Sequence, residues 1–369
     1  MKRAKGIYLL ILAVLAGVMF STFGKALSID RRGLVHAMGI DVQGSDYLVT
    51  VQVFKPSGAG AETSVDISQT NIQTVSGHGK TVSEAVAECR AVSGKELFFG
   101  HMQLICLGKD VDMSAPEELF AFALGDKNIS PTAQICLAKD KASDIMEASL
   151  SSEETSAEAL LSMLKVSCEY GRTVECTLRD MLSVAERECT ILPVMEVIEK
   201  SEDSGEKSED DKVAPVGSAV IKDGVPHELI PPENGLETAL LCKKAKKGSI
   251  VAKLDGKQIS CALEDSKVRW NLRIKDGKLH LTCDIELTAR PDLEITPEEN
   301  DPLAKQLSAE ISKRCSKALD ERLKNGEDIW GIKQMIKHYY PKLLLENKDS
   351  TDKLTAQMTS EIRAYVKVG

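Results

Sequence analysis

Histidine side chains are the first candidates for metal binding or proton transfer in this 369-residue sequence, which contains six of them. None has a second His, Cys or carboxylate three or four residues away in a recognisable metal-binding pattern, and a zinc site needs three or four such ligands. His36 and His101 lie in apolar runs and are predicted to be hydrogen-bonded core residues of strands. His227 and His280 are predicted to face solvent. We therefore predict no metal site.

Cysteines are the second candidates, and all ten are spread singly, without C-x-x-C or C-x-x-C-H: Cys89, Cys106, Cys136, Cys168, Cys176, Cys189, Cys242, Cys261, Cys283 and Cys315. Cys89 follows Val82, Ala85 and Val86 at helical spacing, and Cys283 alternates with aliphatic residues. This pattern predicts buried free thiols that act as small hydrophobic residues. Some disulfides are left open as an alternative, because the N-terminus predicts export.

The stretch GHGKT at residues 77–81 resembles the end of a phosphate-binding loop. The complete motif begins with a glycine, and Thr74 stands at that place. Thr81 is followed three residues later by Glu84, which is typical of a capping box at a helix start. We therefore interpret the stretch as a turn that leads into a capped helix, and we predict no cofactor.

Hydrolytic chemistry has no recognisable signature either. The sequence contains no G-x-S-x-G elbow. The acidic pairs Glu117-Glu118, Glu153-Glu154 and Glu298-Glu299 fall at helix starts or loops, where the helix dipole favours negative charge. We predict no catalytic residues and favour a binding or assembly role, with an envelope enzyme as the minority hypothesis.

The N-terminus is typical of an export signal. Lys2, Arg3 and Lys5 precede an uncharged apolar run from Ile7 to Phe20, and small residues follow near Ala26. Extended to residue 23, the run spans roughly 26 Å as a helix, slightly less than a hydrocarbon core of about 30 Å. Residues 1–26 are therefore interpreted as a cleaved signal peptide or a retained membrane anchor, and the rest as extracytoplasmic.

The charge of the exported part excludes two classes of partner. Residues 1–26 carry four basic and no acidic residues, so the remainder has 43 basic and 56 acidic residues, a formal charge of −13. Such a surface is a poor partner for nucleic acid and for anionic lipid headgroups. Attachment to the membrane is therefore expected through the N-terminus or through another protein.

The N-terminal region alternates strand-like and helix-like segments. Strands are predicted at 34–40, 47–54, 67–75, 97–107, 133–138 and 191–198, and helices at 82–93, 117–124, 141–148, 157–169 and 178–188. Residues 199–212 contain no apolar residue and are interpreted as an acidic linker or loop. We place domain boundaries on either side of it, with residues 27–198 as two α+β subdomains and 213–369 as a C-terminal α+β domain.

Three Asp-Gly dipeptides, at 223–224, 255–256 and 276–277, each lie between β-like runs and favour two-residue hairpins. Across the last one, Val268, Trp270, Leu272 and Ile274 are predicted to pair with alternate residues from Leu279 to Leu287. A helix follows, with apolar residues four apart from Leu303 to Leu323 and a stop at residues 325–326. A second helix is predicted at 328–339 and a last strand at 354–368. The fold class is α+β, with three successive mixed domains and mainly antiparallel sheets flanked by helices.

Several stretches together resemble the Ger(x)C family of spore germination proteins, the C subunits of germinant receptors. They are DRR at 30–32 with HAMGIDV and YLVTVQVFKP after it, residues 79–111, VGSAVIKDGVPHEL at 216–229, NGEDIWGIKQMIKHYYPK at 325–342, and the closing IRAYVKVG. The family typically carries a lipid-bearing cysteine two residues before the DRR-like run. Here Ser28 occupies that position, and a serine hydroxyl cannot form the thioether, so no lipidation is predicted.

The resemblance implies a function without chemistry. It implies a membrane-associated subunit on the outer face of the spore inner membrane, which acts in assembly or signal transmission beside an A-type subunit with membrane spans and a transporter-like B-type subunit. The alternative is an exported cell-envelope binding or scaffold protein unrelated to germinant reception. In the first interpretation, the N-terminal helix or the partner subunits replace the missing lipid as the anchor.

Overall fold

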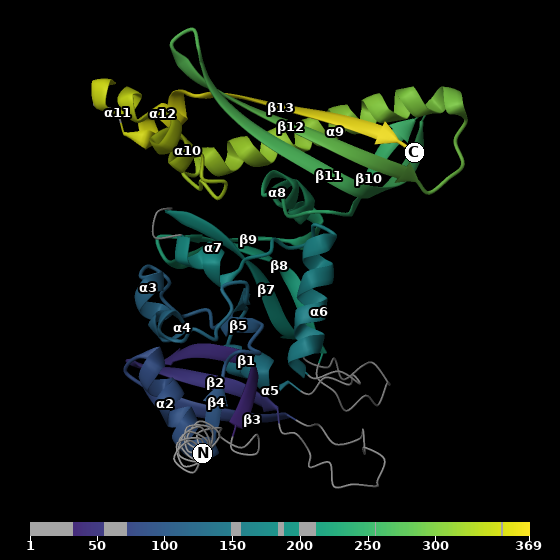
Figure 1. The fold of residues 1–369 in the computed structure, drawn as a ribbon. Helices are drawn as coiled ribbons and strands as arrows, with labels where there is room; N and C mark the ends of the chain where they lie inside the picture. Colours follow the sequence, from purple (N-terminus) through teal and green to yellow (C-terminus); the bar gives the residue numbers. More distant parts are fainter. Residues whose placement is uncertain are drawn as a thin grey trace, which may run out of the picture.

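The computed structural model describes residues 32–54, 72–148, 156–183, 188–198, 212–254, 256–347 and 350–369. These residues form two sheets that follow one another along the molecule, with β1–β3 at one end and the C-terminal sheet at the other (Figure 1). The predicted signal or anchor at 1–26, Ser28 and all but the last residue of the acidic segment 199–212 lie outside the described residues.

A mixed sheet of nine strands forms the larger part, in the order β3-β2-β1-β5-β6-β7-β8-β9, with β4 beside β1. Its strands are β1 (Arg32–Gln43), β2 (Asp46–Phe54), β3 (Ile72–Gly79), β4 (Glu96–Phe98), β5 (Leu104–Leu107), β6 (Gln134–Ala138), β7 (Cys189–Ile198), β8 (Lys212–Lys222) and β9 (Val225–Ile230). The pairs from β1 through β5 and β6 to β7 are parallel, and the pairs at both sides are antiparallel. The sheet is therefore mixed, where we expected mainly antiparallel pairing.

Helices cover both faces of this sheet, because parallel neighbours need crossover connections. One face is covered by α5 (Ala142–Glu147) and α6 (Ser156–Glu169), which share a core with β1, β5 and β6. The other face is covered by α2 (Val82–Ser93), α3 (Pro116–Leu119), α4 (Ala121–Gly125) and α7 (Leu178–Leu182). The predicted helices are confirmed in position, and several are shorter than expected.

The glycines of the GHGKT stretch belong to β3, and not to the turn we expected. A Cβ atom on Gly77 would lie 2.5 Å from the carbonyl oxygen of Ala85, and one on Gly79 would lie 2.5 Å from the amide nitrogen of Ala85. Glycine is needed there because α2 packs directly on the strand. The helix start is as predicted, since Thr81 Oγ1 accepts a hydrogen bond from the amide of Glu84.

The predicted strand at 97–107 is wrong as a single element, because a turn separates β4 from β5. The run is continuously apolar because the turn itself places Phe99 and Met102 in the core. His101 lies in this turn and is exposed, so our prediction of a core histidine there is wrong. His36 lies on β1 but is only half-buried, with its ring stacked on Phe54 at 5.8 Å between centroids.

Strands from both sides of the acidic segment belong to one sheet, since β7 pairs antiparallel with β8 from Cys189 to Lys222. The cluster of buried residues that contains Cys189 and Val220 also contains the core of the C-terminal sheet. The two parts of the chain are thus joined by a continuous core, and the division into three domains stays a prediction.

The C-terminal sheet has four strands in sequence order: β10 (Gly248–Leu254), β11 (Lys257–Lys275), β12 (Lys278–Pro291) and β13 (Thr359–Val368). The predicted hairpin is confirmed with its register, for example Trp270 opposite Cys283 and Leu272 opposite Leu281. The turn residues Asp276 and Gly277 have φ of 52° and 76°, as a two-residue turn of this kind requires. Asp255 lies outside the described residues.

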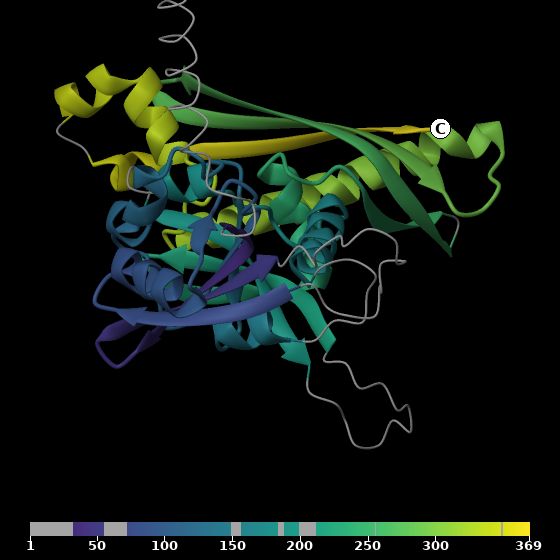
Figure 2. The ribbon, with the colours of Figure 1, turned by 60° about the horizontal axis from the view of Figure 1, so that its bottom comes forward.

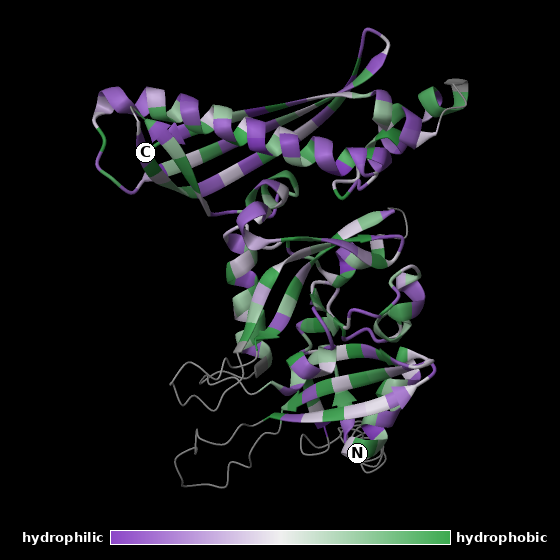
Figure 3. Cartoon of the chain, turned by 180° about the vertical axis from the view of Figure 1, so that it is seen from behind, coloured by the Kyte–Doolittle hydropathy of each residue, from purple (hydrophilic) through white to green (hydrophobic). Residues whose placement is uncertain are grey.

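The remaining elements are the 3₁₀ turn η3 (Pro232–Asn234), α8 (Gly235–Leu241), α9 (Pro297–Lys324), α10 (Ile332–Tyr339), α11 (Pro341–Asn347) and α12 (Thr351–Gln357). The long helix α9 lies along one face of the four-stranded sheet (Figure 2), and hydrophilic residues predominate on its outward side (Figure 3). Its predicted apolar stripe is buried from Leu303 to Leu319, and Leu323 is half-buried. The expected last strand begins five residues late, because residues 351–357 form α12, whose N-terminus Ser350 caps.

None of the ten cysteines forms a disulfide, and all except the half-buried Cys242 are buried. The prediction of buried free thiols is therefore confirmed. Burial raises the pKa of Cys89 to about 11 and that of Cys168 to about 11. Among the described residues, no helix has both the length and the apolar character needed to span a bilayer.

Candidate functional site

The C-terminal end of α9 and the loop after it form the most elaborate polar contact between the two sheets. The helix ends at Lys324 with Asn325 as its C-cap, and Gly326 takes φ of +71°, which turns the chain sharply. The amide of Glu327 then donates to the carbonyl of Arg322 at 2.8 Å. This turn directs the Glu327 side chain toward the β8–β9 hairpin.

Glu327 is the centre of this contact and is completely buried. Its Oε1 lies 2.7 Å from Nδ1 of His227 on β9, and its Oε2 accepts from Nη1 of Arg322 at 2.7 Å. A buried carboxylate is tolerated only when it is paired and hydrogen-bonded, and here both oxygens are satisfied. His227 is exposed, as predicted from the sequence, yet it has a specific partner 100 residues away.

Arg322 joins Glu327 to a second carboxylate on β9. Nη1 and Nη2 of Arg322 donate to the two oxygens of Glu228 at 2.6 and 2.9 Å, a bidentate arrangement that fixes the orientation of both groups. Burial alone would lower the pKa of Arg322, but the two carboxylates outweigh it and raise that pKa. The guanidinium is therefore permanently charged, and it links Glu228 on β9 to Glu327 in the loop after α9.

Further bonds surround this group. Lys222 Nζ on β8 donates to the carbonyl of Asn325 at 2.8 Å. Lys333 on α10 forms ion pairs with Glu188, just before β7, and with Asp352 on α12. Burial would lower the pKa of Lys333, but the hydrogen bonds that Lys333 donates to the two carboxylates outweigh burial and raise it. The C-terminal end of α9 and the helix α10 are thus bonded to one end of the nine-stranded sheet, and α12 is linked to it through Lys333.

The loop also organises α10 behind it. Both oxygens of Asp328 accept backbone amides, from Ile332 at 2.8 Å and from Lys333 at 2.6 Å. We predicted this helix from residue 328, but it begins at Ile332. Asp328 precedes the helix and its carboxylate accepts hydrogen bonds from the first amides of the helix.

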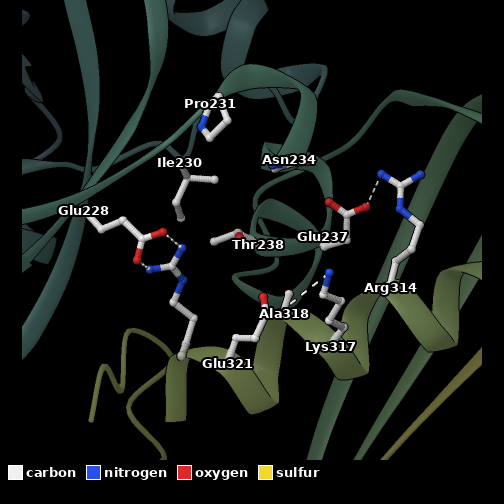
Figure 4. Close-up of a pocket in the computed structure, with 11 residues that line it drawn as sticks. Glu228, Ile230, Pro231, Asn234, Glu237, Thr238, Arg314, Lys317, Ala318 and Glu321 are labelled. Atoms are coloured by element: carbon white, nitrogen blue, oxygen red, sulfur yellow. Dashed lines mark hydrogen bonds and ion pairs between the residues drawn. The ribbon is translucent and has the colours of Figure 1, made fainter. Parts of the chain in front are cut away.

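We call the group formed by His227, Glu228, Arg322 and Glu327 the junction. A polar cleft of about 260 Å³ adjoins it, between β9, α8 and α9 (Figure 4). Glu228 and Arg322 form one wall, and an ion pair between Glu237 and Arg314 forms the other. Lys317 is the most exposed cation of the cleft and lies 3.7 Å from Glu321. The cations and carboxylates balance, and each is already paired, so the walls of the cleft are held in place by ion pairs.

The chemistry of this arrangement is structural. Its charged groups neutralise one another, and no serine or cysteine nucleophile is hydrogen-bonded to a base here. Across the part of the chain that the structure describes, no cluster of three or more His, Cys, Asp and Glu side chains could hold a metal ion. The hydrogen bonds and ion pairs hold β9, Arg322 and Glu327 in fixed positions relative to one another.

Comparison with known proteins gives the family. Residues 25–197 match the family model of the spore germination protein N-terminal domain, and residues 216–369 match that of the spore germination B3/GerAC-like C-terminal region. The chain belongs to the Ger(x)C family of spore germination proteins. The resemblance that the sequence motifs indicated is therefore confirmed, and with it the class of germinant receptor C subunits.

A solved structure shows a similar fold. It is described as the crystal structure of the GerBC protein, and it matches with a TM-score of 0.52 and 13% identity over 90% of this chain and 96% of that one. At this identity the likeness shows the shared fold. No curated protein matches the chain.

The sequence did not point to the junction residues as a group. The stretch NGEDIWG supported only the family resemblance, and His227 was interpreted as an ordinary surface residue. One local signal was available: Glu327 and Asp328 are two adjacent carboxylates between a helix stop and the apolar residues Ile329 and Trp330, an unusual place for charges.

Proposed function

We propose that this Ger(x)C-family protein is a non-catalytic, membrane-associated subunit of a spore germinant receptor, and that it acts in assembly or signal transmission. Its partners are an A-type subunit with membrane spans and a transporter-like B-type subunit, on the outer face of the spore inner membrane. Attachment through the N-terminal segment or through these partners would replace the lipid that Ser28 cannot carry.

The buried group around Glu327 is the observation that most supports a transmitting role. It joins positions about 100 residues apart and links the end of the nine-stranded sheet to α9, which carries the C-terminal sheet. Binding of a ligand or subunit to one sheet can change the position of the other sheet through such a rigid connection, without any chemical reaction in this protein.

Spores of the source organism provide the test. Deletion of the chromosomal copy should abolish the response to at least one nutrient germinant, measured as the fall in optical density of the spore suspension, and the wild-type copy should restore it. A Glu327→Gln copy should restore normal protein and receptor levels with a slower response. The control is Glu321→Gln, which lies on the exposed side of the same helix.

The alternative is an exported cell-envelope scaffold that is unrelated to germinant reception. In that case the deletion spores would respond normally to every germinant, and neither membrane subunit would co-purify with the tagged chain. Either result would overturn the proposal.

A further inference from the structure

The outer face of the C-terminal sheet has a charge opposite to that of the whole chain. Along β11, β12 and β13, the residues that alternate with the buried ones face away from α9. From 267 to 275, 280 to 288 and 359 to 367, the outer positions carry three acidic side chains, Asp284, Glu286 and Glu361, and six basic ones: Lys267, Arg269, Arg273, Lys275, Arg363 and Lys367. The whole chain has a formal charge of −9. We call these three outer rows the basic face.

Pairing within the basic face leaves most of its cations available. Arg269 binds Glu286, and Arg363 donates to both oxygens of Glu361, at 2.9 and 2.6 Å. The other four cations are exposed, and none of them has a carboxylate within 4 Å among the described residues. They are Lys267, Arg273, Lys275 and Lys367.

Asp284 lies at the centre of the basic face with one oxygen unused. In the strand register it stands between Arg269 and Arg363, but each of these guanidinium groups is bonded to a different carboxylate. Within the described part of the chain, the buried Oδ1 of Asp284 has no hydrogen-bond partner. Asp284 lines a groove of about 490 Å³ together with Arg273 and Lys275.

We propose that the basic face docks an acidic surface of a membrane-embedded subunit of the same receptor. Carboxylates of that subunit would pair with the four available cations, and one donor side chain would enter the groove and bond to the carboxylate of Asp284. This inference rests on the proposed function, since it takes the partner from the receptor.

The size of the face fits a small protein contact. With strands about 4.8 Å apart and about 3.4 Å per residue, the three rows cover roughly 35 by 15 Å. That is about 500 Å² on this partner, the lower end of the range for specific interfaces and typical of transient signalling contacts. Charges of both signs in a fixed pattern are typical of a surface that selects one partner and one orientation.

Two other occupants fit less well. An anionic lipid layer would meet three interspersed carboxylates that reduce its attraction to the face. The exposed apolar residues Val251, Ile274 and Tyr365 lie far apart in the strand register, so they do not form a cluster that could insert into a membrane. A second copy placed face to face would bring cations against cations.

The test uses the full chain, tagged and co-expressed in spores with the A-type and B-type subunits of the proposed receptor. The variant Arg273→Glu with Lys275→Glu reverses two available cations of the basic face. The control, Lys305→Glu with Lys313→Glu, makes the same charge change on the exposed side of α9. We expect the basic-face variant to co-purify about tenfold less membrane subunit at low salt, while the control matches wild type. Circular dichroism confirms that both variants are folded.

The outcomes separate this inference from the proposed function. If wild type retains the membrane subunits and the basic-face variant retains them equally, the docking inference is wrong and the proposed function stands. If wild type itself retains neither subunit, the proposed function fails as well. Two further results would overturn the proposal. If the purified chain binds phosphatidylglycerol vesicles and the basic-face variant does not, the face binds lipid. If the chain dimerises in analytical ultracentrifugation and the basic-face variant does not, the face binds a second copy.

Discussion

Ser308 on α9 accepts a hydrogen bond from the backbone amide of Val366 on β13 at 3.0 Å, and its hydroxyl donates to the carbonyl of Ala304 at 2.7 Å. One turn further, Ser312 accepts from the amide of Ala364 at 2.8 Å. β13 is an edge strand, and edge strands expose amides that can recruit another chain. Two serines on the long helix occupy these amides, so the helix protects the edge as well as the core.

Replacing both serines by alanine should expose that edge. Ser308→Ala with Ser312→Ala leaves two amides without partners and is expected to cost about 2 kcal/mol in the free energy of unfolding. Urea denaturation measures the loss, and sedimentation shows whether the chain now associates. Ser316→Ala on the same helix is the control and should change little; a double variant as stable as this control would contradict the prediction.

Glu327 should be among the most sensitive polar residues of the chain. Glu327→Ala leaves the half-buried Arg322 with one carboxylate instead of two, and the expected destabilisation is about 3 kcal/mol. The exposed ion pair of Lys317 and Glu321 provides the comparison, because its loss should cost under about 0.5 kcal/mol. If Glu327→Ala and removal of the Lys317–Glu321 pair lower the free energy of unfolding by similar amounts, the prediction is wrong.

Gly77 tests the interpretation of the GHGKT stretch. A Cβ atom there would approach backbone atoms of Ala85 and Cys89 at 2.5 and 2.7 Å, so Gly77→Ala should push α2 away from β3 and cost about 2–3 kcal/mol. Gly125→Ala is the matched control, since no atom lies within 4 Å of its Cβ position. The melting temperatures of the two variants, measured by thermal unfolding, test this prediction. An unchanged melting temperature for Gly77→Ala would contradict the packing role.

Asp180 should make stability depend on acidic pH. Burial raises the pKa of its carboxyl, but Lys244 and the two hydrogen bonds from Thr177 outweigh burial and lower that pKa below its ordinary value of 3.8. The folded chain therefore binds this proton more weakly than the unfolded chain, and the stabilisation is present above about pH 4 and lost as the pH falls further.

The variant Asp180→Asn isolates this contribution. It should cost about 0.5 kcal/mol near neutral pH, because both partners are partly exposed, and nothing in strong acid. Urea unfolding of the wild type and the variant across this pH range measures the difference, and a difference that does not change with pH would contradict the assignment.

The thiols should react according to burial. At neutral pH the high pKa values of Cys89, Cys168 and Cys189, each about 11, keep these buried groups protonated. A maleimide should therefore label at most Cys242 in the native protein and all ten cysteines after denaturation without reductant. Mass spectrometry counts the labels, and a reductant-dependent gain of two labels would reveal a disulfide.

Much of the C-terminal sheet could be predicted from local pattern. The alternation around Asp276 and Gly277 predicted that alternate apolar residues of β11 and β12 pair across a two-residue turn, because such a turn and one apolar face favour a single register. The fourfold spacing of leucines predicted α9 and its buried stripe for the same kind of reason. Ordered motifs also indicated the family without any structural information.

The sequence by itself therefore determined the types of most elements, the pairing of the β11–β12 hairpin and the membership of the family. Only the tertiary structure decided that β7 and β8 belong to one sheet across the acidic segment, that His101 lies in a turn, that Glu327 is buried against His227 and Arg322, and that basic residues of three strands share one face. The physical reason is distance along the chain: periodicity and turn chemistry are encoded over a few neighbouring residues. The burial of Glu327, by contrast, depends on residues 100 positions away that only folding brings into contact.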